Sequence, residues 1–287
     1  MSPTVAAVIP AYRPDPDLLL PLVRDLVGRH LPVLVVDDGS PCTVDGPLRQ
    51  ASAIGARIGR HRRNAGIARS LNEGLSFAAD LRARWLLTVD QDSTLEPGHV
   101  DRLLSAADHA SRVLAPIEIG AVAAGVIEDA SGPLGYPLRD ERGIRTTEEV
   151  FQTGTLWAVS PLVALGGFDE SLGIDAVDAA ACLSLRSAGL RIVVEPELSI
   201  VHRVGDGRQV RILGRDVLAS GHSPERRATI VRNRLRLFPG EFAESPRHAM
   251  RTLRRVAMQT GLALTIEDDR WAKAKASARG LLPQRNG

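Results

Sequence analysis

The sequence predicts an α/β protein with a mostly parallel central sheet and helices on both of its faces. Short, continuous apolar runs alternate with segments of helical periodicity over the first 100 residues, and this alternation is typical of a parallel sheet that is covered on both sides. The apolar runs also end in polar residues or glycine turns. With 287 residues, the chain can form one large α/β domain with an extension, or two domains.

The elements of the first part follow in order. Apolar runs at 4–10, 33–38 and 84–90 predict buried strands, and leucine and valine spacing predicts helices over 14–29 and 67–83. Polar residues follow each predicted strand, namely Tyr12, Asp37–Asp38 and Asp90–Asp92. Ligands of such sheets bind at the carboxyl ends of the strands, so we expect one shared site there.

The second part is less regular. We expect strands over 120–127, 151–160 and 190–195, helices over 175–188 and 223–238, and a helical segment from about 246. Two polar, glycine-containing stretches are expected to be loops, one before 151 and one over 203–223. Ser223 and Pro224 form a helix start with a capping serine. From Ala272 onward we expect a loose tail.

Composition excludes several classes. Hydrophobic residues make up 44% of the chain and charged residues 24%, which excludes disordered, collagen-like and coiled-coil proteins. No apolar run reaches the roughly 18 residues of a membrane span. Neither a secretory signal nor a disulfide framework is visible, which favours the cytoplasm. A formal net charge of +2 does not indicate a nucleic-acid partner.

Asp90 and Asp92 are two acids at the end of a predicted strand, separated by Gln91. Alternate residues of an extended segment point the same way, so both carboxylates can face one ligand. Hard divalent cations that also hold a diphosphate take such oxygen ligands. The alternative is a solvated turn that caps a helix.

Two further segments are candidates for a nucleotide site. Asp38 ends the second strand and could accept hydrogen bonds from a base or ribose, or it could serve only the turn. Asn64-Ala-Gly66 precedes a helix whose free N–H groups could meet a phosphate, or it is an ordinary loop.

These motifs, taken together and in order, resemble the inverting glycosyltransferases of family 2. The specific likeness is to bacterial rhamnosyltransferases that use dTDP-L-rhamnose, and the matching stretches cover most of residues 4–235. The matching stretches are Pro10-Ala-Tyr-Arg-Pro14, Val36-Asp-Asp-Gly-Ser40, Asn64-Ala-Gly-Ile-Ala68 with Leu71-Asn72, Leu87–Ser93, Thr153-Gly-Thr-Leu156, Gly166-Gly-Phe-Asp-Glu170, Ile174–Asp178 with Cys182-Leu183, His202 with Gly205-Asp206, and His222–Arg227 with Arg232-Asn233.

The resemblance implies a GT-A fold and a role for each matching residue. Asp178 aligns with the base that takes the acceptor proton, while Asp175, one turn earlier, competes for that role. Asp92 and His202 would hold Mg2+ or Mn2+, with Asp90 on the ribose and Asp38 on the pyrimidine. The implied nucleotide-sugar site comprises Pro10, Tyr12, Asp38, Asn64, Gly66, Asp90, Arg226, Arg227 and Arg232. Guanidinium groups match phosphate oxygens, although a solvated basic helix would also explain these arginines.

The chain departs from the family pattern beside the implied acceptor and diphosphate sites. Ala179, Ala180 and Ala181 stand where the family usually has a Glu and an aromatic residue, and Ala228 and Thr229 stand where it usually has two tyrosines. The acceptor therefore stays open between a cell-wall polysaccharide, a lipid-linked sugar and a small natural product. The metal and base positions are unaffected.

We expect a GT-A catalytic domain over 1–240 and a basic helical extension over 241–287. Within the first, 1–118 would bind the nucleotide and 119–240 the acceptor. The extension has arginines on one helical side, with Met250, Leu253, Ala257 and Leu264 opposite. Such a helix could rest on the inner face of a membrane, or pack on the catalytic domain or a second copy of the chain.

The expected function is metal-dependent transfer of L-rhamnose from dTDP-L-rhamnose to a hydroxyl of a saccharide or glycolipid, with inversion. One alternative is a transferase of the same fold that uses a UDP-hexose or UDP-galactofuranose. A nucleotidyltransferase would need a glycine-rich phosphate loop with a basic residue after the first strand, which 10–14 does not supply. The remaining alternative is a nucleotide-sugar-binding module without turnover.

Overall fold

The structure is a computed structural model that describes residues 4–41, 45–129, 132–202, 208–212, 215–219, 223–265 and 270–280. The chain forms two compact units. The first comprises Met1–Glu128, Pro133–Gly173 and Val177–His202, and the second comprises Asp129–Gly132, Ile174–Ala176 and Arg203–Gly287.

The first unit is built on a mixed sheet that has eleven strands within the described residues. Nine of them follow the order β3-β2-β1-β4-β10-β6-β11-β9-β8, while β5 pairs with β11 and β7 with β6. The β1–β2, β1–β4, β2–β3 and β6–β11 pairs are parallel, and β10 runs antiparallel between β4 and β6. The strands are β1 (Val5–Ala11), β2 (Val33–Asp37), β3 (Arg57–Arg60), β4 (Trp85–Thr88), β5 (Thr94–Leu95), β6 (Ile119–Asp129), β7 (Gly132–Gly135), β8 (Arg139–Glu141), β9 (Ile144–Thr147), β10 (Thr155–Ala158) and β11 (Arg191–Val201).

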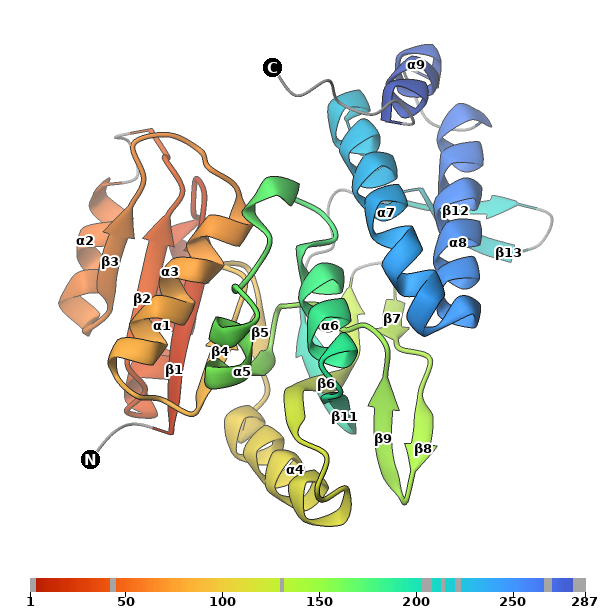
Figure 1. Ribbon diagram of the computed structural model, residues 1–287. Coiled ribbons are helices and arrows are strands. Elements are labelled where there is room, and N and C mark those ends of the chain that lie inside the picture. The colour runs from red at the N-terminus through yellow and green to blue at the C-terminus, as the bar shows by residue number, and fades with distance from the viewer. Residues whose placement is uncertain are drawn as a thin grey trace. The chain divides into compact units, whose positions relative to one another are not determined.

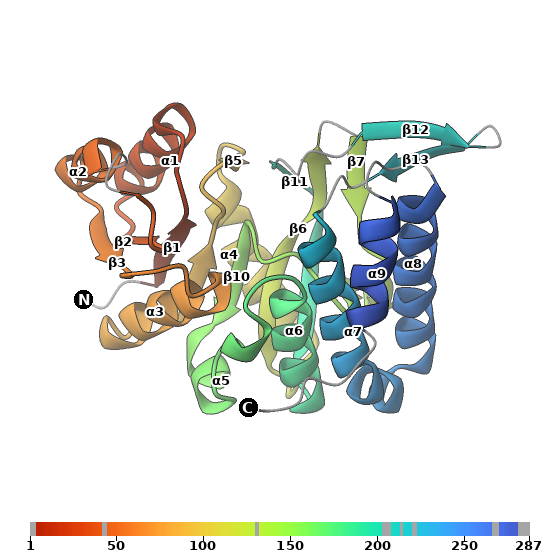
Figure 2. The ribbon, with the colours of Figure 1, turned by 90° about the horizontal axis from the view of Figure 1, so that it is seen from above.

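Helices cover both faces of this sheet. Figure 2 shows α1 and α2 on one face of β1–β3 and α3 on the other. Gly74 lets α3 approach β1 closely, because a Cβ there would lie 2.4 Å from the Cβ of Val8. The predicted α/β class with a covered, partly parallel sheet is confirmed. The helices of this unit are α1 (Pro16–Gly28), α2 (Asp45–Ile54), α3 (Ile67–Asp80), α4 (His99–Val113), α5 (Val159–Ala164), the 3-10 turn η2 (Glu170–Leu172) and α6 (Val177–Ser187).

The register of the parallel strands brings their carboxyl ends to one edge. Ala11 pairs with Asp37, and Val8 pairs with Thr88. The polar residues that follow β1, β2 and β4 therefore leave the sheet at the same edge. This edge is the natural place for a ligand of a parallel sheet.

The second unit contains three helices and a two-stranded sheet within its described residues. These are α7 (Pro224–Glu244), α8 (Pro246–Thr265), α9 (Arg270–Gly280), β12 (Arg208–Ile212) and β13 (Arg215–Ala219), and Figure 1 labels them. The predicted cap is confirmed, because Ser223 Oγ accepts a hydrogen bond from the N–H of Arg226 at 3.2 Å. Within the described parts of the chain, no helix is long and apolar enough to cross a membrane.

Four expectations for the chain's secondary structure were wrong or incomplete. The predicted strand over 151–160 is only β10, since the chain turns into α5 at Val159. The stretch before it holds β7, β8 and β9, and the stretch over 203–223 holds β12 and β13, so neither is a plain loop. The tail is helical from Arg270 to Gly280, where α9 packs on α7 so closely that a Cβ on Gly280 would lie 2.5 Å from Ala228 O. The division of the chain at residue 240 stays a prediction.

Candidate active site

The two acids of the Asp90-Gln-Asp92 segment lie beside His202 at the carboxyl edge of the sheet. His202 Nε2 is 3.4 Å from Asp90 Oδ2, and its Nδ1 is 3.4 Å from Asp92 Oδ1. His202 directly follows β11, whereas the acids follow β4, so the fold gathers three potential ligands from distant parts of the chain. All three side chains are partly accessible to solvent.

A hydroxyl network orients this histidine. Ser93 Oγ lies 3.0 Å from His202 Nδ1 and 2.8 Å from Thr153 Oγ1, and Thr153 Oγ1 also accepts the N–H of Asp90 at 3.0 Å. The contact of Nδ1 with Ser93 fixes the ring so that Nε2 faces Asp90 Oδ2. Gln152 Nε2 donates to Asp90 Oδ1 from the same segment as Thr153.

The protonation of Asp90 depends on this crowded setting. Burial raises the pKa of Asp90, and the charge of Asp92 raises it further, while His202 and the hydrogen bond from Gln152 act in the opposite direction. A divalent cation would favour the ionised form. Two carboxylates and one imidazole are a donor set that suits Mg2+ or Mn2+. Asp90 and Asp92 lie equally far from His202, at 3.4 Å. The assignment of Asp90 to the ribose and of Asp92 to the metal therefore stays a prediction.

Asp38 is buried at the end of β2 and holds the loop before α3. Its Oδ1 accepts the N–H of Ala65 at 2.7 Å, and its Oδ2 accepts the N–H of Gly66 at 2.9 Å. His61 Nδ1 is 2.7 Å from the same Oδ1. A carboxylate offers about four acceptor positions, and the described residues use three of those of Asp38, which leaves one for a nucleotide base. The N–H groups of Ala65 and Gly66 are already engaged and are not available to a phosphate in this arrangement, while Asn64 is exposed beside them.

Gly66 occupies a position that only glycine can fill. Its φ is +93°, and a Cβ would lie 2.5 Å from Gly173 O. The loop that carries Asn64 is therefore in contact with the segment that follows η2.

His61 connects Asp38 to α3, and the sequence interpretation did not include it. Its Nε2 is 2.6 Å from Glu73 Oε1 on α3. Burial lowers the pKa of His61, but the hydrogen bonds and charges of Asp38 and Glu73 outweigh this, so the net shift is upward. The imidazole thus lies between two carboxylates that favour its charged form.

We expect the wild type to lose its stability advantage over a His61→Gln variant as the pH rises. Because the folded pKa is raised, the proton on His61 stabilises the folded state fully below the usual pKa of 6.5 and progressively less as the pH passes the folded value. Urea unfolding should give a difference in the free energy of unfolding of about 1–3 kcal/mol at acidic pH, the scale of a charge-assisted hydrogen bond, and a smaller one at alkaline pH. His109→Gln, at an exposed position of α4, should show neither effect. An equal difference at both pH values would exclude a charged His61.

Tyr12 and Pro10 belong to β1 and the turn after it. Pro10 is buried within the strand, whereas the side chain of Tyr12 is 41% exposed. The Tyr12 N–H donates to Gln91 Oε1 at 3.0 Å, and Gln91 Nε2 donates to Tyr12 O at 3.1 Å. Tyr12 is thereby fixed beside the acid pair, and its ring stays accessible.

Asp178 lies in the first turn of α6, where the helix macrodipole favours the ionised carboxylate. Its Oδ1 accepts the N–H of Ala179 at 2.8 Å. Tyr136 lies near it, and Phe151 packs beside Tyr136. The N–H of Phe151 donates to the hydroxyl of Tyr136 at 3.2 Å, and their ring centroids are 6.0 Å apart. Burial raises the pKa of Tyr136, and the negative charge of Asp178 raises it further.

The arginines assigned to the diphosphate all lie on α7, in the second unit. Arg226 makes an ion pair with Asp175, with Nη2 3.1 Å from Oδ1 and Nε 3.3 Å from Oδ2. Arg227 is buried, and Arg232 is partly exposed. Asp175, the competitor for the base role, is therefore engaged by Arg226. A role for these arginines on the donor stays a prediction.

Sequence reasoning missed His61, Glu73 and Gln152 because each is a single polar residue outside a strong motif. His61 lies three positions before Asn64, and Gln152 directly precedes Thr153, so their adjacency to matched motifs was the available signal. Three residues of the matched motifs, Gly205, Asp206 and His222, lie outside the described residues.

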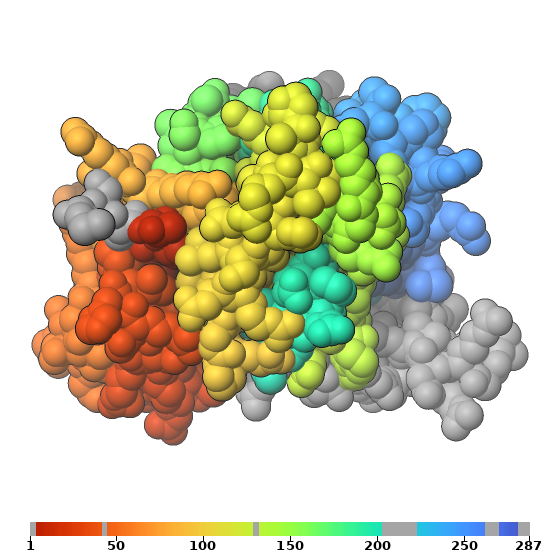
Figure 3. Space-filling model, turned by 90° about the horizontal axis from the view of Figure 1, so that it is seen from below, coloured from red at the N-terminus to blue at the C-terminus, as the bar shows by residue number. Residues whose placement is uncertain are grey.

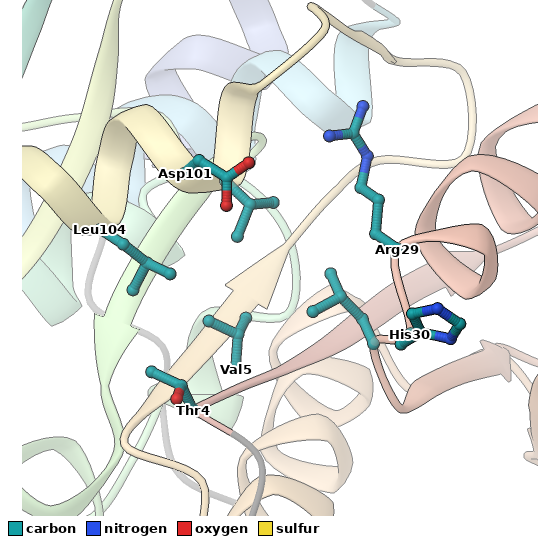
Figure 4. Close-up of a pocket in the computed structure, with 8 residues that line it drawn as sticks. Thr4, Val5, Arg29, His30, Asp101 and Leu104 are labelled. Atoms are coloured by element: carbon teal, nitrogen blue, oxygen red, sulfur yellow. The ribbon is translucent and has the colours of Figure 1, made fainter.

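A pocket lies at the opposite edge of the sheet, near the start of β1. It is lined by Thr4 and Val5, by Arg29 and His30, and by residues of α4 that include Asp101. Figure 3 shows α4 in yellow beside the red N-terminal segment on this face, and Figure 4 shows the lining side chains. Its place at the amino end of β1 separates it from the acids at the carboxyl edge.

Comparison with known proteins gives consistent matches. The family model described as glycosyl transferase family 2 matches residues 6–160. The dTDP-rhamnosyl transferase RfbF of Shigella flexneri is 27% identical over 248 residues, which cover 81% of this chain and 79% of that protein.

Two solved structures are similar to this chain in fold. The mannosyltransferase PcManGT from Pyrobaculum calidifontis, in complex with GDP-Man and Mn2+, has a TM-score of 0.58 at 16% identity and covers 97% of this chain and 74% of its own. Residues 1–349 of S. aureus TarS give a TM-score of 0.58 at 16% identity, covering 96% of this chain and 80% of that one. The same type of fold supports the GT-A expectation, with α7, α8 and α9 as C-terminal helices.

Proposed function

Because the chain belongs to glycosyl transferase family 2, it is a glycosyltransferase, and we propose that it transfers L-rhamnose from dTDP-L-rhamnose to a hydroxyl of a saccharide or glycolipid, with inversion. Metal dependence is supported by one observation, namely that Asp90 and Asp92 both lie next to His202. The choice of rhamnose is supported by the similarity to RfbF across most of both chains.

Asp90, Asp92 and His202 would hold Mg2+ or Mn2+ next to the donor. When bound, the cation supplies positive charge against the negative charge that develops on the leaving diphosphate. Ser93 keeps His202 in the required orientation through its Nδ1. Asp90 is held by two hydrogen bonds. Gln152 Nε2 donates to its carboxylate, and its own N–H donates to Thr153 Oγ1.

The nucleotide would lie over Asp38 and Tyr12. The acceptor position of Asp38 that the protein leaves open can take an N–H of the pyrimidine base. The exposed Tyr12 ring, which is tied to Gln91, can cover the base from the side of the acid pair. Arg226, Arg227 and Arg232 are proposed to contact the diphosphate.

Asp178 would act as the base. It takes the proton of the acceptor hydroxyl while the acceptor oxygen forms the new bond to the anomeric carbon and the bond to the diphosphate breaks with its electron pair. Attack from the face opposite the diphosphate inverts the anomeric carbon. Phe151, which lies against Tyr136, is 36% exposed, so its ring can pack against an acceptor sugar and replace the aromatic residue of the family pattern that this chain lacks.

Thermal unfolding with a panel of dTDP-, UDP- and GDP-sugars, each with and without Mn2+, tests this function. A ligand at a hundredfold excess over its Kd stabilises the folded state by about 2.7 kcal/mol, which shifts the midpoint by several degrees. We expect the largest shift with dTDP-L-rhamnose, and we expect chelation of the metal to reverse it.

Other results would change the proposal in defined ways. A larger shift with a UDP-sugar would overturn the rhamnose assignment and keep the family chemistry. No shift with any nucleotide would favour a module without turnover. The metal salt alone, without a sugar nucleotide, is the matched control for stabilisation by the cation itself.

A further inference from the structure

The outer side of α8 combines arginine and methionine side chains. Met250 is 44% exposed and Met258 is 57% exposed, whereas His248, Ala249 and Thr252 are buried. The exposed arginines of this helix are Arg247, Arg251, Arg254 and Arg255. The expectation that Met250 lies opposite the arginines was wrong, because residues four apart on a helix share one side and Arg254 lies between the two methionines.

Trp271, at the start of α9, is 82% exposed and is the most exposed of the large hydrophobic residues described. The other two tryptophans, Trp85 and Trp157, are 1% and 0% exposed. Trp271 follows Arg270 and shares α9 with Lys273, Lys275 and Arg279, so this exposed aromatic side chain belongs to a basic helix.

Helices α8 and α9 are basic, while three acidic residues, Glu267, Asp268 and Asp269, lie between them in the sequence. Together α8 and α9 contain eight of the 36 Lys and Arg residues and none of the 34 acidic residues. Since the whole chain has a net charge of only +2, the remainder is net negative. The charge of the helices themselves therefore favours an anionic partner, and that partner also has to accept methionine and tryptophan side chains.

We propose that the Arg–Met face, which consists of Met250, Arg254, Met258 and the neighbouring exposed arginines of α8, binds the surface of an anionic lipid bilayer, and that Trp271 of α9 inserts into the same surface. Methionine and tryptophan side chains enter the headgroup region while the arginines contact lipid phosphates. The helix lies on the membrane and does not cross it, in keeping with the hydropathy of the described helices. A second copy of the chain would oppose arginines to arginines, which disfavours that occupant. The proposal is independent of the choice of donor sugar.

The full chain carries its own reporter for this contact. Because Trp85 and Trp157 are buried, a change of tryptophan emission on addition of vesicles reports mainly on Trp271. We expect a shift to shorter wavelength, together with co-sedimentation, for vesicles of phosphatidylcholine mixed with phosphatidylglycerol. Vesicles of phosphatidylcholine alone should give neither, and high salt should weaken both.

Two variants test the face itself. Each basic residue near an anionic membrane contributes about fivefold in partitioning, so Arg247→Gln with Arg254→Gln and Arg255→Gln should weaken binding by about a hundredfold. Trp271→Ala should weaken binding and abolish the emission change. These side chains are exposed, so the thermal midpoint should not move.

The control variant replaces three exposed arginines of the first unit, Arg24, Arg49 and Arg112, by Gln. It has the same net charge as the test variant and should bind vesicles as the wild type does. Equal binding by wild type and test variant would overturn the proposal. So would an emission shift that appears without lipid as the protein concentration rises, which would assign the face to a second copy. A similar shift on adding a DNA duplex, with no vesicle binding, would assign it to another polyanion.

Discussion

Replacement of Asp178 by Asn is expected to lower kcat by about two to four orders of magnitude, the usual contribution of a positioned general base. Asn retains the size of the side chain and an oxygen that can accept the N–H of Ala179, so the first turn of α6 should remain formed. What is lost is the ability to take a proton. Steady-state turnover with a saturating donor, and donor binding measured by thermal shift, separate these two effects.

Asp101→Asn is the matched control for this experiment. Asp101 also lies in the first turn of a helix, α4, but beside the pocket at the opposite edge of the sheet. It should retain wild-type turnover. If Asp178→Asn turns over as fast as the wild type, the proposed base is wrong, and Asp175 would be the next residue to replace.

Removal of one metal ligand should be nearly as damaging. We expect Asp92→Asn to lower turnover at least a hundredfold, because charge stabilisation by a bound cation contributes several kcal/mol to the transition state. The metal-dependent part of the donor-induced thermal shift should disappear as well. Isothermal titration with Mn2+ in the presence of donor measures the same loss directly.

His202→Ala should weaken Mn2+ binding in the same assay, while Asp80→Asn, at the exposed end of α3, should leave it unchanged. Retention of metal-dependent turnover by both Asp92→Asn and His202→Ala would place the cation elsewhere. Full activity in the presence of a strong chelator would remove the cation from the mechanism.

The central strands could be predicted because they are buried on both sides. Every residue of β1, β2 and β4 is buried, so each strand is a continuous apolar run in the sequence. β3 lies at the edge of the sheet, begins and ends with an exposed arginine, and gives no such signal. α9 has almost no apolar side, and its helix depends on small residues that fit against α7, which a periodicity argument does not detect.

The candidate site was predictable where chemistry follows a strand end, and not where it depends on tertiary contacts. Asp38 directly follows β2, and Asp90 and Asp92 lie two and four residues after the end of β4. The alternative of a plain turn for Asp38 could not be rejected from sequence, and the structure shows that it does hold a loop, through Ala65 and Gly66. No local sequence pattern could reveal that His61 bridges Asp38, at the end of β2, and Glu73, on α3.

Helix α3 connects the loop that Asp38 holds to the segment around Phe168, which precedes Asp178 in the chain. In the middle of this helix, Glu73 contacts His61 and thereby the loop that Asp38 holds. One residue earlier, Asn72 Nδ2 donates to Phe168 O at 2.9 Å and Asn72 Oδ1 accepts the N–H of Phe168 at 2.8 Å. The helix thus acts as a rigid spacer between the nucleotide loop and the segment that leads toward Asp178. The separation between the Asp38 loop and the proposed base is then set within the protein, and we expect a change at Asn72 to alter that separation without touching a substrate.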